Sequence, residues 1–215
     1  MVRCFLNKIT LKDYGLVSIG SHTGFWLTKE IEKFSNTKIL LVEPVKYNLD
    51  ELKKLIKSYK NIEIEESAIS NKDEKVPFYY IKKSSIDKLK KHWASGIGSF
   101  DKNHILNHRS KRFLVDENDI ESTNINCLSF VSLIKKYSIN SIEKLMLDVE
   151  GAEYKILKSI DFRSVKIKEI FFEKKHFDGS FSEGKKYEEI KAILIKEGYD
   201  LIEVDKENIS AKKSF

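Results

Sequence analysis

Residues 16–24 read LVSIGSHTG, a short buried-strand pattern that turns at Gly20 and leads into a helix. The apolar side chains that follow have the four-then-three spacing of a helix face, at Leu27, Ile31 and Phe34. Gly20 and Gly24 let the backbone turn tightly and approach a ligand closely, and the helix start offers N–H groups to an anion. A plain strand-to-helix turn has the same spacing, so that alternative stays open here.

Strand-like and helical patterns alternate along most of the chain. The predicted strands cover residues 16–19, 38–42, 62–68, 76–81, 145–149 and 169–173, and a closing hairpin covers 199–204 and 209–213. Helical patterns lie between them, at residues 27–34, 49–59, 128–137, 152–160 and 187–194, the last ending at Gly198. This alternation predicts an α/β fold with a mostly parallel sheet, whose ligands bind beyond the carboxyl ends of the strands.

Length and composition indicate one folded domain. The chain has 215 residues, of which 41% are hydrophobic, so global disorder is excluded and residues 1–215 are expected to form a single domain. Residues 82–126 lack a clear period and are expected to form an insertion or cap on the substrate side. Cys4 and Cys127 do not make a disulfide framework or a metal knuckle, which favours reduced thiols. Without a signal peptide or a spanning segment, a cytoplasmic location is expected.

The formal charge of +6 is concentrated in one segment. Residues 72–112 contain nine Lys and two Arg against four acidic residues, whereas the rest of the chain is almost neutral. Only four of the 39 basic residues are Arg, and nucleic-acid recognition favours the Arg fork, so nucleic acid is not the expected partner. The charge instead predicts an anionic acceptor near this segment.

Glu43 ends the second predicted strand, 23 positions after Gly20. An acidic residue there can accept hydrogen bonds from both ribose hydroxyls of a nucleoside cofactor. A solvated carboxylate capping the helix after Pro44 is the alternative. Together with the glycine turn, Glu43 favours a nucleoside-binding domain, and the GxGxxG of dinucleotide oxidoreductases is missing.

A second polar turn, DVEGAE at residues 148–153, ends the fourth of the strands alternating with helices. With IGSHTG after the first strand and VEPVKYNLDEL after the second, the chain resembles the FkbM family of S-adenosylmethionine-dependent methyltransferases from about Gly15 to Lys213. The resemblance implies a Rossmann-like class I methyltransferase fold, with a seven-stranded, mostly parallel sheet, helices on both faces and an antiparallel last strand. It also implies S-adenosylmethionine as cofactor and O-methylation of hydroxyls, often on sugars or related metabolites.

The resemblance assigns roles residue by residue. It places Gly20, Ser21, His22 and Gly24 beside the methionine part of the cofactor, Glu43 at the ribose, Ser67 and Ala68 beside the adenine, and it matches Asp148, Glu150 and Glu173 to family acids. Two positions depart from the family pattern: Ser18 stands where an Asp is usual, and Met146 where a Lys is frequent.

The expected catalytic residues are Asp148, Glu150, Glu173 and His176. Asp148 is expected to contact the cofactor or the nucleophile, while Glu150 has helix capping as an alternative, and His176 is a candidate base or a surface residue. A divalent metal is not expected, although Asp148 and Glu173 with a third ligand would suit Mg²⁺.

The insertion supplies the expected substrate residues. Trp93 and Phe100 are candidates for a sugar platform, with a loop anchored by buried aromatics as the alternative. His104 and His108 lie four apart, but without a nearby carboxylate a basic surface, shared with Arg109 and Arg112, is the better interpretation.

The function predicted from the sequence is therefore an O-methyltransferase acting on an anionic glycan or related metabolite. A nucleic-acid methyltransferase and a non-catalytic cofactor-fold binding protein are the alternatives. The oligomeric state is left open.

Overall fold

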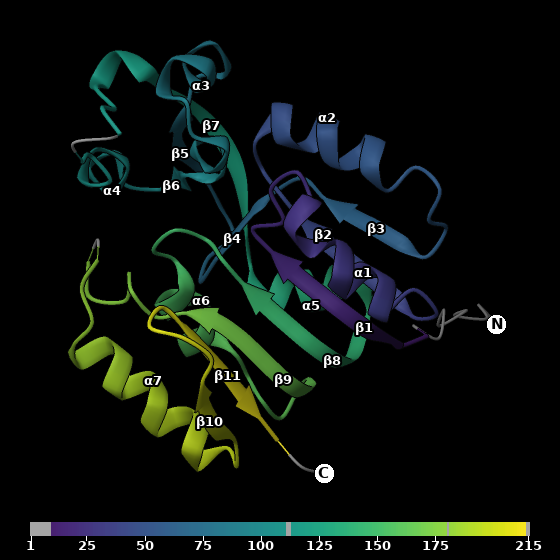
Figure 1. Cartoon of the computed structure of the whole chain (residues 1–215). Coiled ribbons are helices and arrows are strands. Elements are labelled where there is room, and N and C mark those ends of the chain that lie inside the picture. The colour runs from purple at the N-terminus through teal and green to yellow at the C-terminus, as the bar shows by residue number, and fades with distance from the viewer. Residues whose placement is uncertain (1–9, 111–112, 180, 214–215) are drawn as a thin grey trace, which may run out of the picture.

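The computed structural model describes residues 10–110, 113–179 and 181–213. Its main sheet has seven strands in the order β10-β11-β9-β8-β1-β2-β3 (Figure 1). The strands are β1 (Lys12–Ile19), β2 (Lys38–Val42), β3 (Ile62–Glu65), β8 (Ile139–Leu147), β9 (Lys166–Glu173), β10 (Asp200–Glu203) and β11 (Asn208–Lys212). All neighbours pair in parallel except β11, which runs antiparallel to both β9 and β10. The predicted fold class, including its antiparallel last strand, is confirmed.

Helices cover both faces of this sheet. They are α1 (Thr28–Lys33), α2 (Lys46–Leu55), α5 (Phe130–Tyr137), α6 (Glu153–Ser159) and α7 (Lys185–Lys196). Alternate residues of β2 belong to different cores, because successive side chains in a strand point to opposite faces. Ile39 and Leu41 pack with α1 and α2, whereas Leu40 and Val42 pack with α5, α6 and α7.

A second, four-stranded sheet lies beyond the carboxyl ends of β1 and β8 (Figure 1). It contains β4 (Ala68–Ser70), β5 (Glu74–Ile81), β6 (Gly98–Ser99) and β7 (Ile120–Ser129), with the short helices α3 (Lys83–Leu89) and α4 (Lys102–Asn107) beside it. Part of the insertion has its own apolar cluster, which includes Leu89, Ile97, Ile105 and Phe113. These residues therefore form a small packed layer rather than an unsupported loop.

Most predicted elements are present, with two main corrections. Residues 62–68 form not one strand but β3 and the start of β4, which belong to different sheets. The region without a clear period contains most of the ten-residue strand β7, which pairs antiparallel with β5 over residues 120–127. Five of the β7 side chains are exposed and polar, so the alternation of buried and polar residues that signals a strand is weak there.

Several smaller features also bear on the sequence predictions. The helix α7 ends as expected, with Gly198 in the left-handed region at φ 84°. Cys127 is buried and unpaired, and burial raises the pKa of its thiol to about 11, while Cys4 lies outside the described residues. Within the described ranges, no helix has the length and apolar character needed to cross a bilayer.

Candidate functional site

The loops after β1 and β8 are pressed together at the carboxyl edge of the sheet. Gly20 has φ 87°, and a Cβ built on it would lie 1.8 Å from the backbone oxygen of Asp148. Only glycine fits this contact without moving one of the two loops. The glycine turn and the acidic turn, 128 positions apart in the chain, thus form one continuous wall.

Glu43 is held at the same edge by its own neighbours. Its Oε2 accepts a hydrogen bond from the His22 backbone at 2.9 Å, and its Oε1 accepts from the Val45 backbone at 2.9 Å and from Asn48 at 3.3 Å. Burial raises the pKa of Glu43 to about 7, although these hydrogen bonds oppose the shift. These hydrogen bonds fix the carboxylate in place. Because Glu43 is buried and α2 has no side-chain cap, the alternative of a solvated helix-capping carboxylate is wrong.

Of the other residues in the glycine turn, Ser21 and Gly24 hold the turn itself in place, whereas His22 contacts the insertion. The Ser21 hydroxyl is fully buried, donating to the Ser18 carbonyl at 3.0 Å and accepting from the Val42 backbone at 3.1 Å. His22 Nε2 lies 2.6 Å from the Ser95 hydroxyl. Gly24 is left-handed and packs against Leu52. The insertion therefore rests directly on this turn.

Two adjoining cavities open along this edge. The inner pocket has an apolar lining that includes Ile19, Val42, Val45, Ile69, Phe78 and Phe100. The outer cavity has a volume of about 1060 Å³ and contains most of the charged groups. Both are lined by Gly20, Glu43, Gly96, Asp148 and Glu150. Ala68 lines the inner pocket, whereas Ser67 does not, and its backbone donates to Glu65 at 3.0 Å instead.

The three carboxylates of the acidic turn, Asp148, Glu150 and Glu153, have different surroundings. Glu153 is fully buried and accepts hydrogen bonds from the Val149 and Gly151 backbones at 2.8 and 2.9 Å, and burial raises its pKa to about 8. Glu153, to which the sequence assigned no role, thus braces the turn. Asp148 lines both cavities and is exposed to them, and desolvation by the surrounding wall together with the nearby Glu150 carboxylate raises the pKa of Asp148.

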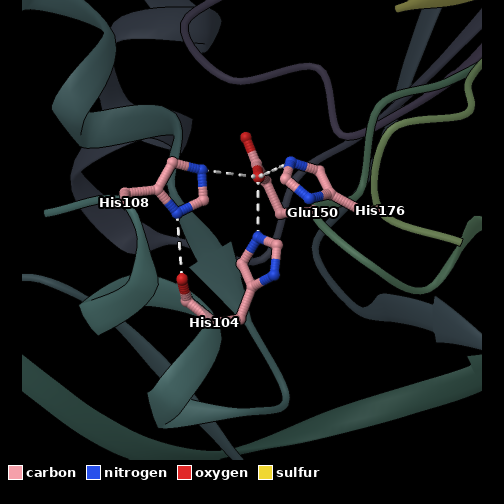
Figure 2. A group of neighbouring side chains, drawn as sticks. All are labelled: His104, His108, Glu150 and His176. Atoms are coloured by element: carbon pink, nitrogen blue, oxygen red, sulfur yellow. Dashed lines mark hydrogen bonds and ion pairs between the residues drawn. The ribbon is translucent and has the colours of Figure 1, made fainter. Parts of the chain in front are cut away.

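Glu150 points toward a group of histidines, as Figure 2 shows. Its Oε2 lies 2.9 Å from His104 Nε2 and 3.5 Å from the Nε2 atoms of His108 and His176. The alternative that Glu150 caps helix α6 is wrong, because no side chain caps that helix and the Glu150 carboxylate faces the histidines instead. The sequence shows no carboxylate near the His104–His108 pair. The structure supplies one, Glu150, from a loop 42 positions beyond His108.

The end of β9 contributes a second group of charges. Glu173 is buried and pairs with Lys175, which also contacts Glu207 at 2.8 Å. His176 is 3% exposed, so its interpretation as a surface residue is wrong, and burial lowers its pKa to about 3. Sequence reasoning missed Lys175 and Glu207, both of which line the outer cavity. The EKKH order could have drawn attention to Lys175, but nothing local marks Glu207.

The expected substrate residues are only partly brought together. Trp93 lines the outer cavity and contacts Phe113, whereas Phe100 lines the inner pocket and packs edge-to-face on Phe78, so the two rings do not share a platform. His108 lines the outer cavity, but Arg109 is exposed and lines neither cavity. Arg112 lies outside the described residues.

The methyltransferase FkbM domain model matches residues 18–201. The chain belongs to the FkbM methyltransferase family. The predicted family and its enzyme class, a methyltransferase, are thereby confirmed.

A solved structure shares the fold of this chain at a TM-score above 0.5, and two others match more weakly. An FkbM methyltransferase from Methylobacillus flagellatus is 12% identical with a TM-score of 0.51, and the match covers 97% of this chain but only 46% of that one. Fibrillarin from Aeropyrum pernix, solved with S-adenosyl-L-methionine, is 12% identical with a TM-score of 0.43, covering 94% and 67% of the two chains. TrmK from M. capricolum, solved with S-adenosyl-homocysteine, is 11% identical with a TM-score of 0.40, covering 100% and 70%. No curated protein matches the chain.

The two departures from the FkbM pattern have different surroundings. Ser18 is fully buried, and its hydroxyl has no hydrogen-bond partner among the described residues. Met146 lies in the apolar core beneath α1 and α2. Two positions before Met146, the buried Lys144 pairs with Glu30 at 2.8 Å. A lysine–carboxylate contact is therefore present on this strand, but farther from the carboxyl edge.

Proposed function

We propose that this domain transfers a methyl group from S-adenosylmethionine to a hydroxyl of a glycan or a related small metabolite. The proposal depends mainly on one observation: Asp148 lines both the apolar inner pocket and the polar outer cavity. A side chain in that position can contact the cofactor and the acceptor together. The reaction needs this juxtaposition, because methyl transfer is an in-line displacement in which positioning supplies much of the rate.

The residues present fit the cofactor. The inner pocket offers an apolar lining for an adenine ring, and the fixed carboxylate of Glu43 offers acceptor lone pairs to the ribose hydroxyls. Gly20 lines both cavities at the point where the two loops meet. When bound, S-adenosylmethionine supplies the methyl group as an electrophilic sulfonium.

The outer cavity supports an acceptor with hydroxyls and apolar faces. Four aromatic side chains from three segments line it with substantial exposure: Phe25 (81%), Trp26 (41%), Trp93 (40%) and Phe181 (55%). Exposed aromatic groups around a cavity mark a binding surface, and sugar rings have apolar faces that pack on them.

The charges of the outer cavity favour an uncharged acceptor over the anionic one expected from composition. Its lining includes five carboxylate side chains and one lysine: Glu43, Asp148, Glu150, Glu173, Glu207 and Lys175. The lysines of the insertion that motivated an anion, such as Lys90 and Lys91, line neither cavity. An anionic group would find one lysine and five carboxyl groups there, so we infer a neutral polyhydroxyl compound.

Methyl transfer from labelled S-adenosylmethionine to an acceptor panel tests the proposal. We expect label on neutral oligosaccharides, in a form stable to mild base, with less on uronic-acid and phosphorylated sugars. Base-labile label would indicate carboxyl methylation and contradict the proposal, and preferential labelling of RNA or DNA would favour the nucleic-acid alternative. Calorimetry with the cofactor alone addresses the non-catalytic alternative, because a binding-incompetent protein would give no heat at millimolar ligand.

A further inference from the structure

Three imidazoles and one carboxylate converge beside the outer cavity. His104 lies in α4 and His108 directly follows this helix, Glu150 lies in the turn after β8, and His176 follows β9 (Figure 2). One ligand atom from each residue lies within 4.8 Å of the others. No role in binding the cofactor accounts for this grouping, because His104 and His176 line neither cavity.

The distances within the cluster are those of a metal site. A tetrahedral zinc ion with bonds of about 2.0–2.2 Å separates its ligand atoms by about 3.3–3.5 Å. The three Nε2 atoms lie 2.9, 3.5 and 3.5 Å from one oxygen, Oε2 of Glu150. Two of these distances match that separation, and all the candidate ligand atoms lie within 4.8 Å of one another.

The hydrogen bond of His108 determines which of its ring nitrogens can bind a cation. His108 Nδ1 lies 2.9 Å from the carbonyl oxygen of His104, and since a carbonyl only accepts, Nδ1 must carry the proton. In the neutral ring, Nε2 then presents a lone pair to Glu150 Oε2, which is also an acceptor. This tautomer, fixed by a backbone carbonyl, is the one found in metal-binding histidines.

His176 differs from the other two histidines. Its Nδ1 accepts a hydrogen bond from the Phe181 backbone at 3.0 Å, so in the neutral ring the proton lies on Nε2. This Nε2 is buried and has no hydrogen-bond partner among the described residues, although it lies 3.5 Å from both Glu150 and Glu173. His176 therefore directs an N–H group, and not a lone pair, toward Glu150 and Glu173, and lies beside the ligand set without belonging to it.

We propose that His104, His108 and Glu150 bind a divalent transition-metal ion of the zinc type. Two imidazoles and one carboxylate select such ions over Mg²⁺, which prefers oxygen ligands. His108 and Glu150 line the outer cavity, so the fourth coordination position faces the space assigned to the acceptor. A three-residue set with an open position is the arrangement of catalytic rather than structural zinc sites.

Metal binding is tested on the full chain after chelator treatment, with Zn²⁺ alone for calorimetry and Co²⁺ alone for visible spectroscopy. We expect one equivalent of Zn²⁺ to bind with micromolar or tighter affinity, and Co²⁺ to give the absorption of a four- or five-coordinate nitrogen–oxygen site. Mg²⁺ at the same concentration should leave the melting temperature unchanged. Absence of stoichiometric Zn²⁺ binding by the folded protein would overturn the proposal.

Variants locate the ion. His108→Ala and Glu150→Gln should each weaken Zn²⁺ binding by about 100-fold or more, whereas His176→Gln should weaken it by about tenfold, as expected for a residue beside the ligand set. His22→Ala removes a cavity histidine outside the cluster and should leave Zn²⁺ affinity unchanged. Equal affinity in wild type and His108→Ala would overturn the assignment.

If a variant does not fold, the X-ray absorption spectrum of the zinc-loaded wild-type protein identifies the ligands. X-ray absorption at the zinc edge should report two imidazoles and oxygen ligands at about 2.0 Å. Sulfur or all-oxygen ligation would contradict the site. These measurements use metal and protein alone, so their outcome is independent of the proposed hydroxyl methylation.

Discussion

The proposed cofactor side and the proposed acceptor side of the cavity wall are built in opposite ways. On the cofactor side, Glu43 takes its hydrogen bonds from His22, Val45 and Asn48, all within 21 positions of it. On the acceptor side, Glu150 meets His104 from 46 positions earlier and His176 from 26 positions later. The first region is largely set by local sequence, whereas the second exists only after the insertion has packed. Substitutions should therefore affect the two regions in different measurements.

Asp148 lies at the border between the two regions and should give the largest effect. Asp148→Asn keeps the shape but removes the negative charge at the point where both cavities meet, so turnover should fall by about 100-fold or more. Cofactor affinity, measured by calorimetry, should change less than about threefold. Asp200→Asn, an exposed carboxylate on β10, is the control. Unchanged turnover would remove Asp148 from the reaction.

Gly20→Ala should damage the cofactor side through sterics alone. The new Cβ would meet the Asp148 carbonyl at 1.8 Å in a left-handed backbone, so we expect a loss of at least about 2 kcal/mol in stability and weaker cofactor binding. Denaturant unfolding measures the first quantity. Gly179→Ala is a matched control, because Gly179 also has positive φ but, among the described residues, no non-adjacent atom lies within 4 Å of its Cβ position. Equal losses in both variants would show that the backbone angle, and not the contact, matters.

The pH dependence of cofactor binding should report Glu43. Its pKa is raised to about 7, and ribose hydroxyls donate best to the ionised form, so affinity should be about tenfold lower at pH 6 than at pH 8. The sign for stability is opposite: with a folded pKa above the unfolded one, this group destabilises the ligand-free protein as pH rises from about 4.5 to 7. Glu43→Gln should flatten the affinity profile, and a slope that persists would assign it to another group.

Phe25→Ala should affect only the acceptor side. The ring is 81% exposed and lines the outer cavity, so its loss should raise the acceptor KM by about three- to tenfold through lost stacking. The cofactor KM and the melting temperature should not move. Ile195→Ala, an exposed apolar residue on α7, provides the comparison. A change in cofactor KM would mean that the two regions are not separable at this position.

Charge reversal at Lys90, Lys91 and Arg109 should have the smallest effect. These residues line neither cavity, and salt screens exposed charges at such distances, so the acceptor KM should change less than about twofold. A titration of ionic strength checks the same point. A large rise in KM would restore the anionic acceptor that the composition suggested.

Sequence was sufficient where chemistry and register are local. The segment KILLV matches β2 residue for residue, and the carboxyl ends of β1, β2, β8 and β9 carry the predicted polar residues. It was insufficient where contacts are remote: the pairing of β7 with β5, and the meeting of Glu150 with His104 and His108, depend on how the insertion packs. The helical spacing of His104 and His108 was visible, but the carboxylate they needed was 42 positions away.

The shared wall also has a consequence for the cycle of turnover. Gly20, Glu43, Gly96, Asp148 and Glu150 line both cavities, so on the proposed function each ligand would change the surroundings of the other, and by thermodynamic linkage the change in affinity would be reciprocal. A sulfonium cofactor carries one positive charge that the spent thioether lacks. The carboxylates along this wall therefore attract the substrate form more than the product form. We therefore expect the spent thioether to dissociate more readily than the sulfonium cofactor.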